Sequence, residues 1–189
     1  TATLGLGDTG PLAALPVIEG KSALIKKFAN LDAFPLCIEE KDPKAIIKFC
    51  KQIEPTFGAI LLEDIKAPEC FEIERTLIEE LNIPVFHDDQ HGTAIVVLAG
   101  LINSMKILNK KKEELKVVIN GAGAAGISIA EQLHSFGIEN IVLLDSKGIL
   151  SKNRTDLNKY KLEALEFTNS ENIDGDLKTA IKDSNCFIG

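Results

Sequence analysis

The stretch that decides the fold is Lys116-Val117-Val118-Ile119-Asn120-Gly121-Ala122-Gly123-Ala124-Ala125-Gly126. It combines an apolar strand, a turn with the spacing Gly-x-Gly-x-x-Gly, and the start of a helix. Gly121 allows the tight turn, Gly123 lets a ligand approach the backbone, and Gly126 lets the helix pack closely on the strand. The first amides of such a helix point at a phosphate. The stretch therefore predicts a Rossmann-type dinucleotide site, with Gly121, Ala122, Gly123, Ala124, Ala125 and Gly126 as its binding residues.

A carboxylate ends the next predicted strand, residues 141–145. Asp145 lies at the distance from the last glycine where a ribose-binding acid is expected. A carboxylate there repels a 2′-phosphate, which slightly favours NAD over NADP. Lys147 follows two residues later and could offset that repulsion, so either dinucleotide stays open.

Strands and helices alternate along the rest of the chain. The predicted strands cover residues 3–7, 33–38, 57–62 and 83–86, and the predicted helices cover residues 11–29, 43–53, 68–81 and 92–108. This alternation is typical of an α/β fold with a parallel sheet built from βαβ units. We place a domain boundary at the charged run 109–114, which separates a first α/β domain (1–109) from a Rossmann-type domain (110–189) that is incomplete at its C-terminus.

Two pairs of acids follow two of the predicted strands. Glu63 and Asp64 come directly after the strand at 57–62, and Asp88 and Asp89 come shortly after the next strand. Ligands bind beyond the carboxyl ends of parallel strands, so these four carboxylates are expected to converge. They would repel one another unless a cation lay among them. Oxygen ligands suit Mg²⁺ or Mn²⁺ better than zinc, so the first domain is predicted to hold such a metal.

The helix predicted at 11–29 is expected to be broken or kinked near Pro16, and Lys21 lies where the turn after Pro16 ends and the helix begins again. Most lysines simply lie on the surface. If Lys21 faces the carboxylates, a nearby cation and desolvation would both lower its pKa. It could then serve as a general base.

The histidines and cysteines favour neither a zinc site nor a disulfide framework. His87 and His91 precede the predicted helix instead of lying on it, so His91 is interpreted as a loop or capping residue. The four cysteines (Cys37, Cys50, Cys70 and Cys186) form no close CxxC pair. Free thiols suit a reducing compartment, so we expect an intracellular, cytoplasmic protein.

Composition excludes several classes of function. Hydrophobic residues make up 45% of the 189 residues, enough for a packed core. The net charge of −7 argues against nucleic-acid binding, which needs a basic surface. We find no run of about 18 apolar residues and no signal peptide, so no membrane partner is expected. The chain lacks an initiating Met and ends within a predicted strand, which indicates a fragment of a longer protein.

Taken together, these stretches resemble malic enzymes, and the bacterial-type branch most of all. The resemblance is carried by Gly5-Leu6-Gly7-Asp8, Gly10-Pro11-Leu12-Ala13, Pro16-Val17-Ile18-Glu19-Gly20-Lys21, Leu62-Glu63-Asp64-Ile65-Lys66-Ala67-Pro68, Phe86-His87-Asp88-Asp89-Gln90-His91-Gly92-Thr93-Ala94 and Asn120-Gly121-Ala122-Gly123-Ala124-Ala125-Gly126. They occur in the family's order and spacing, over nearly the whole chain.

The resemblance implies an oxidoreductase that converts malate to pyruvate and CO₂ while reducing NAD(P)⁺, with a divalent metal. It implies that Glu63, Asp64 and Asp89 bind the metal. It makes Lys21 the general base and Asp88 the carboxylate that supports it. It further implies that Thr93 lies near the cofactor, and that the intact protein is a homo-oligomer.

The sequence departs from the family's pattern in one respect. The family's catalytic tyrosine and a substrate-binding arginine lie upstream of the first motif, and no such residues are present. Tyr160, the only tyrosine, is interpreted as structural. We therefore expect this chain alone to be inactive. A malolactic-type or other 2-hydroxy-acid enzyme, and a segment that only binds nucleotide and metal, stay open as alternatives, whereas phosphate transfer would need a GxxxxGK[ST] loop that is absent.

Overall fold

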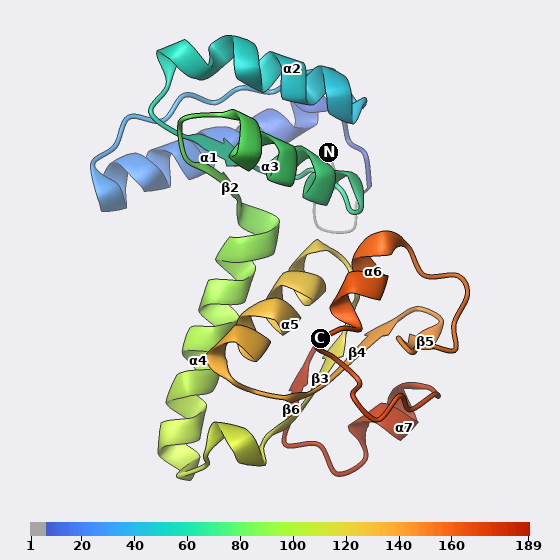
Figure 1. The fold of residues 1–189 in the computed structure, drawn as a ribbon. Coiled ribbons are helices and arrows are strands. Elements are labelled where there is room, and N and C mark those ends of the chain that lie inside the picture. The colour runs from blue at the N-terminus through green and yellow to red at the C-terminus, as the bar shows by residue number, and fades with distance from the viewer. Residues whose placement is uncertain (1–6) are drawn as a thin grey trace. The chain divides into compact units, whose positions relative to one another are not determined.

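The computed structural model describes residues 7–189, and the chain divides into two compact units, Thr1–Phe86 and His87–Gly189 (Figure 1). The second unit therefore includes the helix at 93–108, and the boundary expected after residue 109 stays a prediction. The α/β class with parallel strands is confirmed. The strand expected at 3–7 lies outside the described residues, apart from Gly7.

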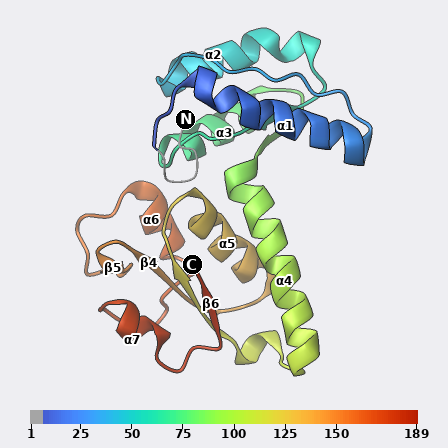
Figure 2. The ribbon, with the colours of Figure 1, turned by 180° about the vertical axis from the view of Figure 1, so that it is seen from behind.

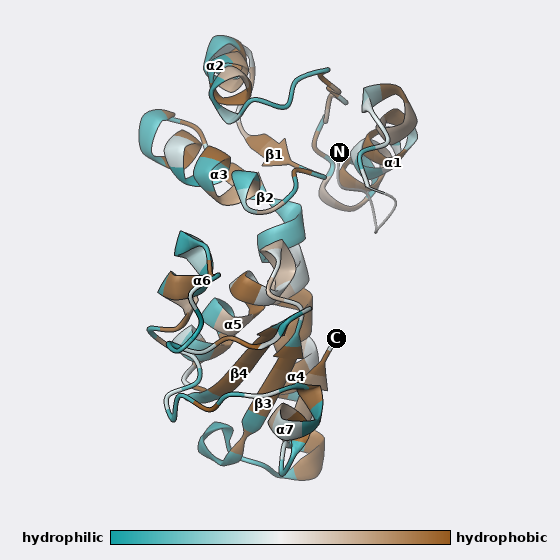
Figure 3. Ribbon diagram, turned by 90° about the vertical axis from the view of Figure 1, so that its right-hand side faces the viewer, coloured by the Kyte–Doolittle hydropathy of each residue, from teal (hydrophilic) through white to brown (hydrophobic). Residues whose placement is uncertain are grey.

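The first unit contains a two-stranded sheet with helices packed around it. Its elements are α1 (Pro11–Ala29), α2 (Pro43–Ile53), the 3₁₀ turn η2 (Glu54–Thr56), β1 (Ile60–Leu62), α3 (Glu69–Glu80) and β2 (Val85–His87). β1 and β2 are hydrogen-bonded neighbours, and α2 packs against α3. Figure 3 shows β1 as an apolar strand beside these helices. The shared core consists of Ile46, Cys50, Leu62, Ile73, Leu77 and Leu81.

Local signals explain the helices of this unit. The Asp42 side chain accepts a hydrogen bond from the Lys44 amide (3.4 Å) and so caps α2, with Pro43 at the first helical position. The bounds of α2 agree with the helix predicted at 43–53. α1 also begins with a proline, Pro11, and it continues through Pro16 without the break that the sequence suggested.

The strand predicted at 33–38 is wrong, because residues 30–42 form no regular secondary structure. Pro35 has no amide hydrogen for a sheet ladder. Phe34 and Leu36 are exposed, so the apolar pattern does not mark a buried strand.

The second unit is built on a four-stranded sheet with the order β5-β4-β3-β6. Its elements are the π-helical turn η3 (Asp88–Gly92), α4 (Thr93–Leu108), the 3₁₀ turn η4 (Lys112–Glu114), β3 (Lys116–Asn120), α5 (Ala124–Phe136), β4 (Asn140–Asp145), β5 (Gly148–Ile149), α6 (Lys159–Ala164), α7 (Leu177–Ile181) and β6 (Cys186–Ile188). β3 runs parallel to both β4 and β6, whereas β5 is antiparallel to β4. β5 lies in the polar segment after β4, where no strand was predicted.

Helices cover both faces of this sheet (Figure 2). α5 packs against β3 and β4, and α4 packs against α5. On the opposite face Ala180 of α7 joins Val118, Val142, Leu144 and Ile149 in a buried cluster. Burial on both faces explains why β3 and β4 read as continuous apolar runs instead of alternating ones.

α4 is far less buried than its composition suggested. Only Ala94 and Leu101 are buried, while Ile107 is 83% exposed. By length and composition alone, the helix Asp88–Leu108 could cross a membrane. This is weak evidence for a membrane span, because core helices of soluble proteins pass the same test. Its low burial follows from its few neighbours, because among the described elements α5 and η3 are its main packing partners.

Candidate functional site

In the first unit, a lysine and two acids meet at the end of β1. Lys21 lies well inside α1 instead of at a helix start, and its Nζ forms an ion pair with Oε2 of Glu63. Glu63 directly follows β1, and both side chains are largely buried. Pairing is expected here, because isolated charges of opposite sign are costly to bury separately.

Asp64 is held in an unusual conformation beside this pair. Its φ of 55° lies in the left-handed region, which a non-glycine residue seldom adopts. Asp64 is buried, with 8% of its surface exposed. One carboxylate oxygen of Glu63 and one of Asp64 lie within 4.8 Å of each other. Strained conformations of this kind gather at functional sites, where the backbone directs a side chain to a required position.

The negative charge of Asp64 also affects the thiol of Cys37. Burial is the main cause that raises the pKa of its thiol, followed by the negative charges of Glu19 and Asp64. Cys37 therefore stays a protonated thiol at neutral pH, which does not favour metal ligation by its sulfur.

The second pair of acids lies in the turn η3, directly after β2. Oδ1 of Asp88 packs so closely on Gly92 that a Cβ at position 92 would lie 2.2 Å from it. His87 is fully buried, and its Nε2 lies 3.4 Å from Oδ2 of Asp89. Because β2 is the neighbour of β1 in the sheet, both pairs of acids follow adjacent strands, as the sequence predicted.

η3 also connects to the helix that follows the glycine turn. His91 Nδ1 lies 3.4 Å from the hydroxyl of Ser128, which is buried on α5. This contact agrees with His91 as a residue of the turn. Thr93, expected near the cofactor, is the half-buried first residue of α4.

The glycine turn has the local geometry that a dinucleotide needs. Gly121 has a φ of 137°, and its amide donates to the carbonyl of Leu144 on β4 (2.9 Å). A Cβ on Gly126 would lie 1.7 Å from the Gly121 carbonyl oxygen, so the backbone of the helix packs directly against the backbone of the turn. A Cβ on Gly123 would meet no protein atom within 4 Å. No side chain caps α5, which leaves its first amides without a side-chain acceptor.

These features fit a bound pyrophosphate. Two glycines allow the fold of the turn, and Gly123 keeps clear the space that a phosphate would take. The helix amides supply donors and a partial positive charge.

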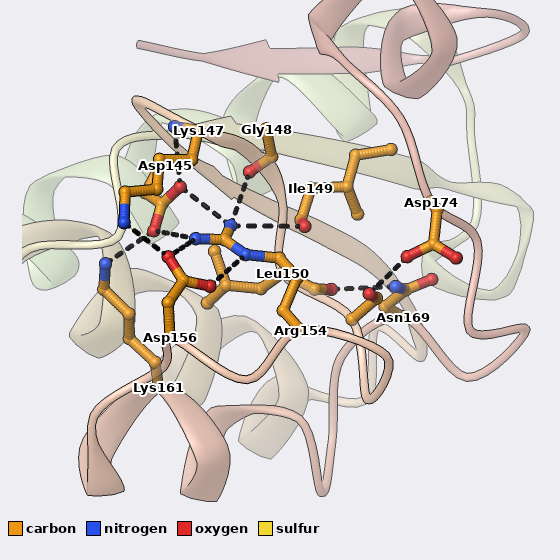
Figure 4. A network of polar contacts seen from close by, with 11 residues as sticks. Asp145, Lys147, Gly148, Ile149, Leu150, Arg154, Asp156, Lys161, Asn169 and Asp174 are labelled. Carbon is orange, nitrogen blue, oxygen red and sulfur yellow. Dashed lines mark hydrogen bonds and ion pairs between the residues drawn. The ribbon is translucent and has the colours of Figure 1, made fainter.

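Asp145, the predicted ribose ligand, is the centre of a network of charges (Figure 4). Nη1 and Nη2 of Arg154 donate to its two oxygens at 2.8 and 3.0 Å, and Nζ of Lys161 donates to Oδ2 at 2.6 Å. The backbone amide of Lys147 donates to Oδ1 at 2.9 Å. Burial acts to raise the pKa of Asp145, but these hydrogen bonds outweigh it and hold the pKa well below the usual range.

A second carboxylate completes the network. Asp156 accepts hydrogen bonds from Arg154 Nε and Nη2, both at 2.9 Å, and from Lys147 Nζ at 2.8 Å. The bonds from Arg154, followed by that from Lys147, hold the pKa of Asp156 well below its ordinary value. Both acids are therefore ionised at neutral pH.

Sequence reasoning missed Arg154, Asp156 and Lys161. They lie 9, 11 and 16 residues beyond Asp145, in the polar segment after β4. No fixed spacing marks them, because the fold of this segment brings them back to the strand end. Asn169 stabilises that fold by donating to the carbonyls of Leu150 (2.8 Å) and Ile173 (2.9 Å).

Two family models match the chain. The malic enzyme N-terminal domain matches residues 1–78, and the malic enzyme NAD-binding domain matches residues 90–185. The chain belongs to the malic enzyme family. The resemblance inferred from the motifs is thereby confirmed.

Similar malic enzymes include both NAD- and NADP-dependent proteins. The NAD-dependent malic enzyme of Geobacillus stearothermophilus is 53% identical over 189 residues, which cover 100% of this chain and 40% of that protein. The bifunctional malic/malolactic enzyme of Bacillus subtilis is 54% identical and is covered to 46%. The NADP-dependent malic enzyme of Haemophilus influenzae is 48% identical and is covered to 25%. The chain spans less than half the length of these curated relatives.

Solved malic enzyme structures share the fold. The crystal structure of the NAD-dependent malic enzyme of Thermotoga maritima matches with a TM-score of 0.95 and 54% identity, covering 100% of this chain and 50% of that one. The malic enzyme of Pyrococcus horikoshii matches with a TM-score of 0.92 and 47% identity, covering 98% of this chain and 45% of that one.

Proposed function

We propose that the protein carrying this chain converts malate to pyruvate and CO₂ with reduction of NAD(P)⁺. The observation that carries the proposal is the ion pair of Lys21 with Glu63 beside the strained Asp64. It lies in the part of the chain that matches the malic enzyme N-terminal domain. A base and two oxygen ligands at one strand end are what the oxidation of a hydroxy acid requires.

Glu63, Asp64 and Asp89 are the proposed ligands of Mg²⁺ or Mn²⁺. Support comes from the adjacency of β1 and β2, since Glu63 and Asp64 follow one strand and Asp89 follows the other. Carboxylate oxygens suit these hard cations. When bound, the metal supplies a positive charge that orients malate and stabilises negative charge on the substrate oxygen.

Lys21 is the proposed general base. A cation held by Glu63 would compete with Lys21 for that carboxylate. Its charge would also favour release of the lysine proton to solvent, which would leave the neutral amine that a base requires. Lys21 then accepts the proton of the C2 hydroxyl as hydride leaves C2. Asp88, on the turn after β2, is the proposed carboxylate that orients this lysine.

The glycine turn is the proposed dinucleotide site, with Gly121, Ala122, Gly123, Ala124, Ala125 and Gly126 at the pyrophosphate. Thr93 is proposed near the cofactor, and Asp145 with Lys147 is proposed at the adenosine ribose. When bound, the nicotinamide supplies the hydride acceptor.

The test is a steady-state assay of the full-length protein with malate, Mn²⁺ and each dinucleotide. Wild type should reduce the nicotinamide, and the Lys21→Met variant should lose about 10²–10⁴-fold in kcat, the size expected for a general base. Lys27→Met is the matched control, because Lys27 lies on the same helix and is exposed. Equal kcat values for Lys21→Met and wild type would contradict the proposal.

A malolactic activity is the second candidate, because one relative is named a bifunctional malic/malolactic enzyme. Product analysis separates the two reactions. Malic enzyme activity yields pyruvate with one reduced dinucleotide per turnover, whereas malolactic activity yields lactate without accumulation of reduced dinucleotide.

We further propose that the intact protein is an intracellular homo-oligomer without a membrane or nucleic-acid partner. The acidic charge of −7 supports the exclusion of nucleic acid. α4 exposes several large apolar side chains. Exposed apolar surface of this kind supports the proposal that another part of the intact protein, or another subunit, covers this helix.

A further inference from the structure

We propose that His91 is a positioning residue, whose contact with Ser128 fixes the turn η3 on α5, the helix that follows the glycine turn. η3 carries Asp88 and Asp89, so this contact sets where the two carboxylates lie. The inference rests on the proposed function, in which Asp89 binds the metal and Asp88 supports Lys21. It gives a role to a histidine that the sequence indicated only as a loop or capping residue.

The two acids of η3 are held by neighbours close to them in the sequence. Asp88 lies over Gly92, where a Cβ would be 2.2 Å from its Oδ1. Oδ2 of Asp89 lies 3.4 Å from Nε2 of His87. The amide of Thr93 donates to the carbonyl of Asp88 and closes the turn. These contacts shape the turn, but they join residues only a few positions apart, so they do not decide where the turn lies within its unit.

Packing against α5 decides where the turn lies. Among the described elements, η3 packs mainly against α5 and against α4, which continues directly from it. His91 supplies a polar contact to this packing, because its Nδ1 lies 3.4 Å from the hydroxyl of Ser128. Only 2% of Ser128 is exposed, and a hydroxyl buried in this way needs a hydrogen-bond partner. The hydroxyl can donate to Nδ1 or accept from it, according to the tautomer of the ring.

α5 is itself fixed to the glycine turn. A Cβ on Gly126 would lie 1.7 Å from the Gly121 carbonyl oxygen, so helix and turn cannot slide past each other freely. Ile127 and Ile129, on either side of Ser128, are buried. A turn held by Ser128 is therefore held relative to the backbone that is proposed to bind the pyrophosphate. Hydride transfer needs substrate and nicotinamide in register, so a small displacement of η3 should lower the rate.

A double-mutant cycle in the full-length protein tests the contact. Ser128→Ala removes the hydroxyl and keeps a good helix former, so folding is not at risk. With malate, Mn²⁺ and NAD⁺, it should lower kcat about three- to tenfold, the size expected for one lost hydrogen bond. The Kd for Mn²⁺, measured by electron paramagnetic resonance, should rise by a similar factor. The Kd for NADH should stay unchanged, because the glycine turn is intact.

The histidine completes the cycle. His91→Leu should lower kcat at least as much as Ser128→Ala, and adding Ser128→Ala to it should lower kcat no further, because both changes remove the same contact. His91→Asn should restore most of the kcat, since its side-chain amide can hydrogen-bond the hydroxyl. Ser104→Ala is the matched control, because this exposed hydroxyl on α4 donates to the carbonyl of Gly100 (2.9 Å). An unchanged kcat in Ser128→Ala, or effects that multiply in the double variant, would overturn the inference.

Hydrogen exchange in the protein without metal or dinucleotide separates this inference from the proposed function. Ser128→Ala should speed the exchange of the backbone amides of residues 88–92, because the turn loses a contact outside itself, while the amides of β3 stay protected. Unchanged exchange in the turn would overturn the inference. A wild-type protein that does not oxidise malate would instead refute the proposed function, and the exchange rates would still decide whether Ser128 holds the turn.

Discussion

At the scale of single residues, the site depends on two kinds of position. At the first kind, a side chain must be absent, as at Gly126, where a Cβ would collide with the Gly121 carbonyl. At the second kind, an ionised side chain is held by opposite charge, as in the ion pair of Lys21 with Glu63. A substitution that would be harmless on the surface is therefore expected to be harmful at either kind of position.

A pair of glycine substitutions separates folding from binding. Gly126→Ala forces the turn apart and should cost about 1–3 kcal/mol of stability, the usual range for overpacking. Gly123→Ala meets no protein atom, so its stability should stay near that of wild type while its methyl group occupies the phosphate space. Thermal unfolding and NADH titration check both variants. Equal unfolding temperatures for the two would contradict the assigned roles.

At the scale of elements, the turn η3 joins a strand to a long helix and carries two acids on the way. Asp88 can lie over the turn only because Gly92 has no side chain. η3 also packs against α5, the helix that follows the glycine turn. A short turn thus determines where the carboxylate that is proposed to support Lys21 lies.

Gly92→Ala should therefore displace Asp88. The clash falls on the tip of a side chain, which can move, so stability should change little. We expect kcat to fall by about tenfold or more, because a misplaced supporting group is costly in catalysis, while NADH binding persists. Gly100→Ala is the control on α4, since its Cβ meets nothing within 4 Å. Unchanged kcat in Gly92→Ala would rule out the positioning role of this turn.

At the scale of the whole molecule, the proposed chemistry is divided between two compact units. Lys21, Glu63 and Asp64 belong to the first, whereas Asp88, Asp89, the glycine turn and the Asp145 network belong to the second. Metal binding and dinucleotide binding therefore depend on different groups and should be separable.

Removal of the metal tests this division. A chelator should abolish malate-dependent reduction in the full-length protein, and added Mn²⁺ or Mg²⁺ should restore it. The Kd for NADH should stay within about threefold, because none of the proposed metal ligands belongs to the glycine turn and exposed charges are screened by salt. Loss of NADH binding upon chelation would show that the two functions are not separable in this way.

The sequence by itself determined the features that depend on neighbours a few residues apart. The helix at 43–53, the glycine spacing before α5 and the apolar runs of β3 and β4 are local patterns, and each was predicted. The strand predicted at 33–38 shows the limit, because an apolar pattern does not reveal whether a partner strand exists. Only the tertiary structure decided the partners of charged groups. Glu63 lies 42 residues from Lys21, and Arg154 and Lys161 reach Asp145 through the folded segment after β4. Such pairs follow from the path of the backbone in space, since the Coulomb attraction between two side chains depends on their distance and not on their separation in sequence.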